Sequence, residues 1–264
     1  TDIYGYMTYL SRERVLHQNS DASGYGLNAA SRARKIATIR SFYKYLTNKV
    51  HLIKENPVKD LDSPKLKKTL PKYLTLEESV QLLSSVDGQN RERDYCILTL
   101  FLNCGLRISE LCALNTTDIQ DDALRVLGKG NKVRIVYLND ACKEALNGYL
   151  AVRRPIVGRD QNALFLSSSN ERVGRSTVHA LVKKHLSEAR LDSTQYSAHK
   201  LRHTAATLML QNGVDVKAVQ EVLGHEHLNT TEIYTHIDNE ALRVAAKANP
   251  LSRVKPPKKN EAGN

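Results

Sequence analysis

The chain has 264 residues, of which 41% are apolar, so it is long enough to fold as one large domain or two ordinary ones. Its 39 lysines and arginines exceed its 28 acidic residues, and the net charge of +11 fits either a polyanionic partner or solubility alone. No stretch predicts a membrane-spanning helix, and the first residues lack the pattern of a secretory signal. We therefore expect a cytoplasmic, nucleoid-associated protein.

The first segment of the chain is predicted to be helical. A helix is expected at residues 1–12, and a second one carries apolar residues at intervals of three and four from Ile36 to Leu46. Five cations lie mostly off this apolar stripe, with no acidic residue among them. A charged helix face is usually only solvated, but this uninterrupted run favours contact with phosphates. The five cations are Arg32, Arg34, Lys35, Arg40 and Lys44.

Residues 63–72 are predicted to link two domains. Pro64 and Pro71 bracket several lysines and few apolar residues, a composition that is typical of an extended, solvated segment. Thr75 and Glu78 then have the spacing of a capping box, which predicts the start of a new helix. The expected division is a first domain at 1–62, a second domain at 73–250 and a disordered tail at 251–264.

The second segment is predicted to mix helices with a small antiparallel sheet, which makes the chain mainly α. Residues 93–114 have a helical pattern that is interrupted at residues 103–105, and apolar residues alternate on both sides of residues 128–131, which predicts a β-hairpin. Residues 163–166 are a candidate third strand. Further helices are expected at 177–190, 199–212, 216–223, 231–236 and 239–248, with Asp215 as an N-cap and glycines at 213 and 224 as helix ends.

The cysteines predict no disulfide framework. The four include no C-x-x-C pair, and three fall in apolar helical stretches. This pattern is typical of buried free thiols in a reducing compartment. The cysteines are Cys96, Cys104, Cys112 and Cys142.

Six polar side chains of the second segment could together act on a phosphodiester. Two arginines can bracket a phosphate with forked donors, and histidines can complete the site. A tyrosine hydroxyl can attack the phosphorus, while a hairpin lysine protonates the departing 5′ oxygen. Each residue alone also has an ordinary structural explanation, such as an ion pair between Arg107 and Glu110. The six are Arg107, Lys129, His199, Arg202, His225 and Tyr234.

A zinc site is the alternative explanation for His199, together with a nearby histidine. His199 and His203 are four residues apart, which is the spacing of two zinc ligands on a helix. However, no glutamate or cysteine completes a recognised metal pattern, and Arg202 would face nearly the same way as His199. A cation beside Zn²⁺ is unfavourable. We therefore expect neither a metal nor a cofactor.

Four motifs resemble the tyrosine recombinases, also called the phage integrase family. They are CGLRISEL, GKGNKVR, HKLRHTAAT and LGHEHLNTTEIYTH. The likeness runs from about Ala33 to about Pro250 and is closest to bacterial Xer-type recombinases and their mobile-element relatives. The family order of Arg, Lys, His-x-x-Arg, His and Tyr is also the order in this chain.

The resemblance implies a role for each candidate residue. Arg107 and Arg202 would bind the scissile phosphate together with His225, Lys129 would act as the general acid, and Tyr234 would be the nucleophile.

The same resemblance covers the residues around them. His199 would assist proton removal from the nucleophile, and Glu110 would brace the site. Lys132 and Arg134 are expected to contact DNA from the hairpin. Tyr137 stands where many relatives carry proline, a difference from which we expect little consequence.

The resemblance also implies an architecture and partners. A helical core-binding domain and a catalytic domain would form a C-shaped clamp on double-stranded DNA that carries a specific recombination site. Four protomers would exchange strands through a Holliday junction, with the C-terminal segment around residues 239–251 docked in trans on a neighbour. Accessory recombinases or directionality factors are further possible partners. Because the first domain begins at what resembles the family's second helix, we expect a preceding part to be missing.

The expected function is therefore site-specific DNA recombination, in integration and excision or in chromosome-dimer resolution. Two alternatives remain open at this point. A type IB topoisomerase shares the chemistry but acts alone, and a DNA-binding regulator would have lost catalysis.

Overall fold

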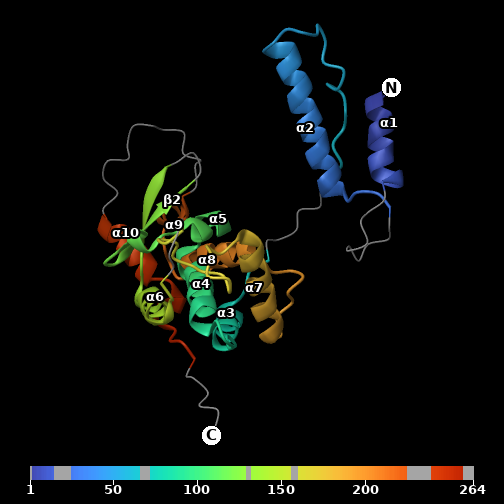
Figure 1. Cartoon of the computed structure of the whole chain (residues 1–264). Coiled ribbons are helices and arrows are strands. Elements are labelled where there is room, and N and C mark those ends of the chain that lie inside the picture. The colour runs from blue at the N-terminus through green and yellow to red at the C-terminus, as the bar shows by residue number, and fades with distance from the viewer. Residues whose placement is uncertain are drawn as a thin grey trace. The chain divides into compact units, whose positions relative to one another are not determined.

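The protein is mainly helical with one small antiparallel sheet, as predicted (Figure 1). Residue contacts divide the chain into two compact units, Thr1–Leu70 and Pro71–Asn264. Within the described residues, every helix is too short or too polar to span a lipid bilayer. The computed structural model describes residues 2–14, 25–65, 72–128, 132–155, 160–224 and 239–257.

The described part of the first unit contains two helical segments. Helix α1 (Asp2–Thr8) continues into the π-helical turn η1 (Tyr9–Glu13). Helix α2 (Ala29–Asn48) begins where the side chain of Asn28 accepts a hydrogen bond from the Ser31 amide at 2.8 Å. The predicted apolar stripe of α2 faces a small core. The buried members of this core are Ile36, Val58 and Leu61.

Helix α4 is the central helix of the second unit. Every residue from Asp94 to Cys104 is buried, and both α6 and α8 pack against α4. The predicted capping box begins α3, where the Glu78 amide donates to the Thr75 hydroxyl at 3.1 Å. The helices that surround or include this core helix are α3 (Leu76–Ser84), α4 (Arg91–Cys104), α6 (Asp140–Val152), α7 (Arg175–Glu188) and α8 (Ala198–Gln211), and α5, α9 and α10 are described below.

The predicted interruption after α4 positions the site described below. Gly105 ends α4 with a φ of +58°, a left-handed conformation that favours glycine. Helix α5 (Ile108–Ala113) starts three residues later and is followed by the 3-10 turn η2 (Thr116–Asp118). The sequence pattern therefore predicted both the break and its place.

The sheet contains the predicted hairpin but a different third strand. Strands β1 (Ile119–Gln120), β2 (Ala123–Leu127) and β3 (Val133–Tyr137) are antiparallel in the order β1-β2-β3, and Leu127 pairs with Val133 nearest the hairpin turn.

The prediction of a strand at residues 163–166 was wrong. Ala163 and Leu166 form only isolated bridges, with Asn115 and Arg172. The segment is fully buried in the core rather than placed at the sheet edge. A short apolar run has the same pattern in both situations.

The C-terminal helices lie close to their predicted positions. Helices α9 (Val216–Leu223) and α10 (Asn239–Lys247) pack on each other. The side chain of Asp215 caps α9 as predicted by accepting from the Lys217 amide at 2.8 Å, and Gly224 ends this helix with a φ of +64°. The helix expected at 231–236 lies outside the described residues.

A disordered tail was predicted to begin at residue 251, but the structure is ordered beyond this point. Residues Pro250–Arg253 form the 3-10 turn η4, and Leu251 is completely buried in the main core. The buried side-chain amide of Asn249 donates from Nδ2 to the Leu102 carbonyl at 3.0 Å, and the Tyr95 hydroxyl donates to the Val254 carbonyl at 3.3 Å. The sequence prediction failed because a single leucine, Leu251, attaches this segment to the core, and one apolar residue makes no periodic pattern.

The four cysteines are buried free thiols, as predicted. The Sγ atoms of Cys104 and Cys142 lie 3.6 Å apart between α4 and α6. Burial raises the pKa of Cys142 well above that of an exposed thiol, so this residue stays protonated at neutral pH.

We predict that Leu251→Ala lowers the free energy of unfolding by about 2–5 kcal/mol, because it leaves a cavity where η4 meets the core. Urea unfolding measures this loss. The matched control is Lys255→Ala, at an exposed position of the same segment, with an expected change of less than about 0.5 kcal/mol. Equal unfolding midpoints for both variants would contradict the packing role of η4.

Candidate functional site

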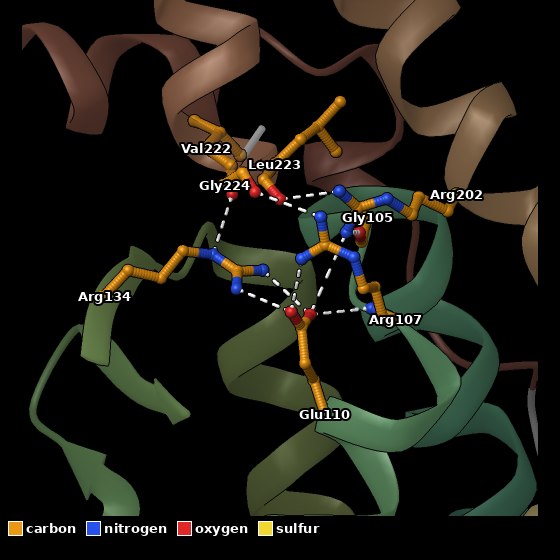
Figure 2. A network of polar contacts seen from close by, with 8 residues as sticks. All are labelled: Gly105, Arg107, Glu110, Arg134, Arg202, Val222, Leu223 and Gly224. Carbon is orange, nitrogen blue, oxygen red and sulfur yellow. Dashed lines mark hydrogen bonds and ion pairs between the residues drawn. The ribbon is translucent and has the colours of Figure 1, made fainter. Parts of the chain in front are cut away.

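Arg107 and Arg202 meet at the end of α9 (Figure 2). Arg202 donates from Nη1 to the Gly105 carbonyl and from Nη2 to the Leu223 carbonyl, each at 2.6 Å. Arg107 donates from Nη2 to the next carbonyl along the chain, that of Gly224, at 3.0 Å. These bonds to neighbouring carbonyls hold the two guanidinium groups, hereafter the arginine pair, close together.

Two glycines allow this close approach. A Cβ atom added at Gly105 would lie 2.4 Å from the Cδ2 atom of Leu223, so any other residue would require the buried Leu223 side chain to move. A Cβ atom added at Gly224 would lie 2.9 Å from the Cδ atom of Arg134. Both residues also have positive φ, so the backbone conformation and the limited space each favour glycine at these positions.

Glu110 is the centre of the polar network in Figure 2. Its Oε2 accepts from the Arg107 amide at 2.8 Å, and its Oε1 accepts from Nη1 of Arg107 at 2.7 Å. Arg134 binds both carboxylate oxygens, at 2.8 and 2.9 Å, and Nη1 of Arg202 lies 3.8 Å from Oε2. Burial alone would raise the pKa of Glu110, but the hydrogen bonds from Arg134 and Arg107 outweigh it and lower the pKa to about 2.

The arginine pair differs in solvent exposure. The side chain of Arg107 is 37% exposed, whereas that of Arg202 is 8% exposed. Burial, reinforced by the charge of Arg107, lowers the pKa of Arg202 to about 10, so the guanidinium stays protonated at neutral pH. Among the described side chains of the network, three arginines face one carboxylate, which leaves a formal charge of +2. The arrangement suits an anion that approaches from the side of Arg107.

His199 and Arg202 share the first turns of α8, as the spacing predicted. His199 is exposed, while His203 is half-buried and makes an edge contact with the ring of Tyr73, with centroids 6.3 Å apart. Burial lowers the pKa of His203, and the neighbouring Lys200 and His199 lower it further. In the described part of the chain, no group of three potential metal ligands is found.

Three of the six predicted residues lie outside the described residues. They are Lys129, His225 and Tyr234, whose assignment continues to rest on the motifs.

Two residues that were predicted to contact DNA make contacts within the protein. Arg134 binds Glu110 and lies in the interior, with a side chain that is 16% exposed. Arg40 donates to the Leu61 carbonyl and, at 3.3 Å, to the Ser63 hydroxyl. Strand alternation held a signal that we missed, because Arg134 is two residues from the buried Val136 and therefore faces the same side of β3.

The other predicted DNA-contacting side chains reach solvent. Arg34, Lys44 and Lys132 are exposed, and Arg32 and Lys35 are half-buried.

Known proteins are similar to this chain in sequence and in fold. The Phage integrase family model matches residues 72–241. The chain is 51% identical to tyrosine recombinase XerC of Caldanaerobacter subterraneus subsp. tengcongensis, over 96% of this chain and 69% of the relative. It is 38% identical to tyrosine recombinase XerC of Thermodesulfovibrio yellowstonii, over 86% of this chain and 78% of the relative.

Two solved structures extend the comparison. XerA recombinase matches with 30% identity and a TM-score of 0.55, over 92% of this chain and 80% of that one. XerH site-specific recombinase bound to palindromic difH substrate matches with 26% identity and a TM-score of 0.65, over 83% of this chain and 67% of that one.

We predict that Glu110→Gln destabilises the protein at pH 7 by roughly 3 kcal/mol, the free energy that corresponds to the lowered pKa. Because this pKa is lower in the folded than in the unfolded state, the stabilisation is complete above about pH 5 and is lost as the pH falls toward 2. The stability gap between wild type and variant should therefore narrow on acidification.

Urea midpoints measured between pH 7 and about pH 3 test this prediction. The control is Glu144→Gln, at an exposed position of α6, for which no such gap is expected. A gap for Glu110→Gln that stays constant over this range would show that the carboxylate charge is not what stabilises the fold.

Proposed function

We propose that the arginine pair holds the scissile phosphate of a DNA strand. The basis is that the chain belongs to the phage integrase family and is a site-specific tyrosine recombinase, which cleaves and rejoins DNA strands. The observation that carries this proposal is the close placement of two guanidinium groups in a network with a formal charge of +2. Arg107 is open to an incoming phosphate, and Arg202 is held rigidly behind it. Fixed donors of this kind stabilise the charge that develops on non-bridging oxygens during transfer.

The proposed reaction has two phosphoryl transfers. The Tyr234 hydroxyl attacks phosphorus, forming a 3′-phosphotyrosine bond, and the bond from phosphorus to the 5′ oxygen breaks. His199 assists removal of the tyrosine proton, and Lys129 donates a proton to the departing 5′ oxygen. The 5′ hydroxyl of a partner strand then attacks the phosphotyrosine and releases Tyr234, so the bond energy is kept and no nucleotide cofactor is consumed.

The remaining proposed contacts follow the same family pattern. His225 would add a further donor to the phosphate. In the first unit, the outward cations of α2 would bind the DNA backbone, which makes binding depend steeply on salt. The match to XerH bound to its difH substrate supports double-stranded DNA as the partner.

We further propose that α10 is exchanged between protomers in a tetramer on DNA. In the single chain, Leu242 and Ala245 of α10 pack with α9, and Arg243 stacks over the Tyr137 ring at 4.7 Å and pairs with Asp122 at 2.9 Å. A neighbour's α10 could make the same contacts, because exchange of an identical element needs no new surface.

We predict that wild-type protein forms a covalent adduct with a nicked DNA duplex and that Tyr234→Phe forms none. The duplex would carry the sequence that the protein itself selects from random DNA. Denaturing gels detect the adduct, and filter binding confirms that the variant still binds. Binding without an adduct by the wild type would instead indicate a regulator. Relaxation of plasmid that lacks the selected sequence would indicate a topoisomerase.

We predict that Arg107→Lys lowers the single-turnover cleavage rate by about 100-fold or more while DNA affinity changes little, because lysine cannot supply forked donors. Arg125→Lys is the matched control, since Arg125 is an exposed arginine of β2 that pairs with Asp118 at 3.1 Å. Equal cleavage rates for wild type and Arg107→Lys would remove Arg107 from the phosphate site.

A further inference from the structure

We infer that Arg134 is a positioning residue for cleavage, which neutralises Glu110 so that the arginine pair keeps its charge for the phosphate. The inference rests on the proposed role of the arginine pair and adds a residue to it. Arg134 acts through Glu110 and does not touch the DNA.

The first support is the geometry of the Arg134–Glu110 contact. The guanidinium group binds both carboxylate oxygens, with Nη1 to Oε1 at 2.8 Å and Nη2 to Oε2 at 2.9 Å. Both side chains are largely buried, at 16% and 3% exposed. A buried, forked pair of this kind is strong and fixed in orientation, unlike a pair at the surface.

The second support is that the backbone fixes Arg134 on its other side (Figure 2). Its Nε donates to the Val222 carbonyl at 3.4 Å, and its side chain lies against Gly224, where no Cβ atom would fit. Arg134 therefore links β3, the start of α5 and the end of α9. Arg107 is also bound by the start of α5, through Glu110, and by the end of α9, through the Gly224 carbonyl.

The third support is the charge balance. Among the described residues, Glu110 contacts three cations, Arg107, Arg134 and Arg202. Without Arg134, the carboxylate would be compensated only by the arginine pair, and the formal charge of the described network would fall from +2 to +1. Charge lost beside the arginine pair would weaken the stabilisation of the transition state, because Arg134 and Glu110 are largely buried and water screens buried charges poorly.

Two other roles for Arg134 make different predictions. A direct contact with DNA would make the residue matter for affinity and for the salt dependence of binding. A role in placing the hairpin that carries Lys129 would make it matter for protonation of the 5′ oxygen. Modified scissile phosphates separate these roles from the inferred one.

The experiment compares wild type, Arg134→Gln and Arg134→Lys in single-turnover cleavage of the selected duplex. Arg125→Gln, also an arginine of this sheet that pairs with a carboxylate, is the matched control. Three scissile groups are used. The first is a normal phosphate, the second is a methylphosphonate that lacks one non-bridging charge, and the third has sulfur in place of the bridging 5′ oxygen, so that its leaving group needs no proton.

For Arg134→Gln we expect cleavage of normal DNA to fall by about 10- to 100-fold, with unchanged affinity and salt dependence. On the methylphosphonate, the difference from wild type should shrink to about threefold or less, because less charge has to be stabilised. On the sulfur-containing substrate, the difference should persist. Arg134→Lys keeps the charge and should cleave normal DNA within about tenfold of wild type.

A double variant, Arg134→Gln with Glu110→Gln, adds a test that does not leave a buried carboxylate uncompensated. Removing both charges restores the formal charge of +2, so the double variant should cleave faster than Arg134→Gln alone. If thermal unfolding shows that Arg134→Gln is not folded, the cleavage rates of Arg134→Lys and of the double variant are compared with that of wild type. Cleavage by either of them that is 100-fold slower than wild type would then overturn the inference.

Four other results would overturn it. They are wild-type cleavage by Arg134→Gln, a difference that closes on the sulfur-containing substrate, a loss of affinity with a weaker salt dependence, and a double variant no faster than the folded single one. Failure of the proposed function is distinguishable, because wild-type protein would then form no adduct in the same assay.

Discussion

The second unit depends on one buried ion cluster, in which Glu110 compensates the guanidinium groups around it. A carboxylate that is 3% exposed is stable in the folded state only when it is paired and hydrogen-bonded. Its partners come from separate elements: Arg107 precedes α5, Arg134 lies on β3, and Arg202 lies on α8. Loss of the Glu110 carboxylate would leave Arg134 and Arg202 largely buried without a compensating charge, which costs more than the pairs themselves contribute. The cluster therefore fixes three elements relative to one another at the place where the proposed chemistry requires it.

Helix ends supply the second constraint on this site. Helices α4 and α9 both end at a glycine in the left-handed conformation, and their last carbonyl groups have no partner within the helix. The arginine pair donates to the carbonyls of Gly105, Leu223 and Gly224. The negative end of a helix dipole also favours a cation. Satisfying the helix ends and holding the arginines in a fixed orientation are thus achieved by the same hydrogen bonds, before any phosphate is bound.

Much of the fold could be predicted from the sequence, because apolar periodicity and glycine positions are local signals. They gave α8, α9, α10 and the hairpin within two residues, and the break after α4. The errors at residues 163–166 and at Leu251 arose where burial depends on contacts distant in sequence.

For the site, the motifs singled out Arg107 and Arg202, which lie close together, while the assignments of Lys129, His225 and Tyr234 stay predictions. The carbonyl partners of the arginine pair had no sequence signal, since any residue supplies a carbonyl group. The inward position of Arg134 was predictable from strand alternation, whereas its expected contact with DNA stays a prediction.

The burial of Arg202 is better evidence for function than the exposure of Arg107. Burial lowers the pKa of Arg202 to about 10, so keeping its charge in the folded protein costs roughly 3 kcal/mol at any pH below that value. An apolar side chain of similar size would avoid this cost, and buried charges are often replaced by apolar residues without loss of stability. Arg107, at 37% exposed, carries no comparable cost. A buried charge with a lowered pKa is common at functional sites, and it is consistent with the proposed role of the arginine pair in binding a phosphate. The two carbonyl contacts use two of the five N–H donors of Arg202, and a forked guanidinium can direct others toward a second acceptor.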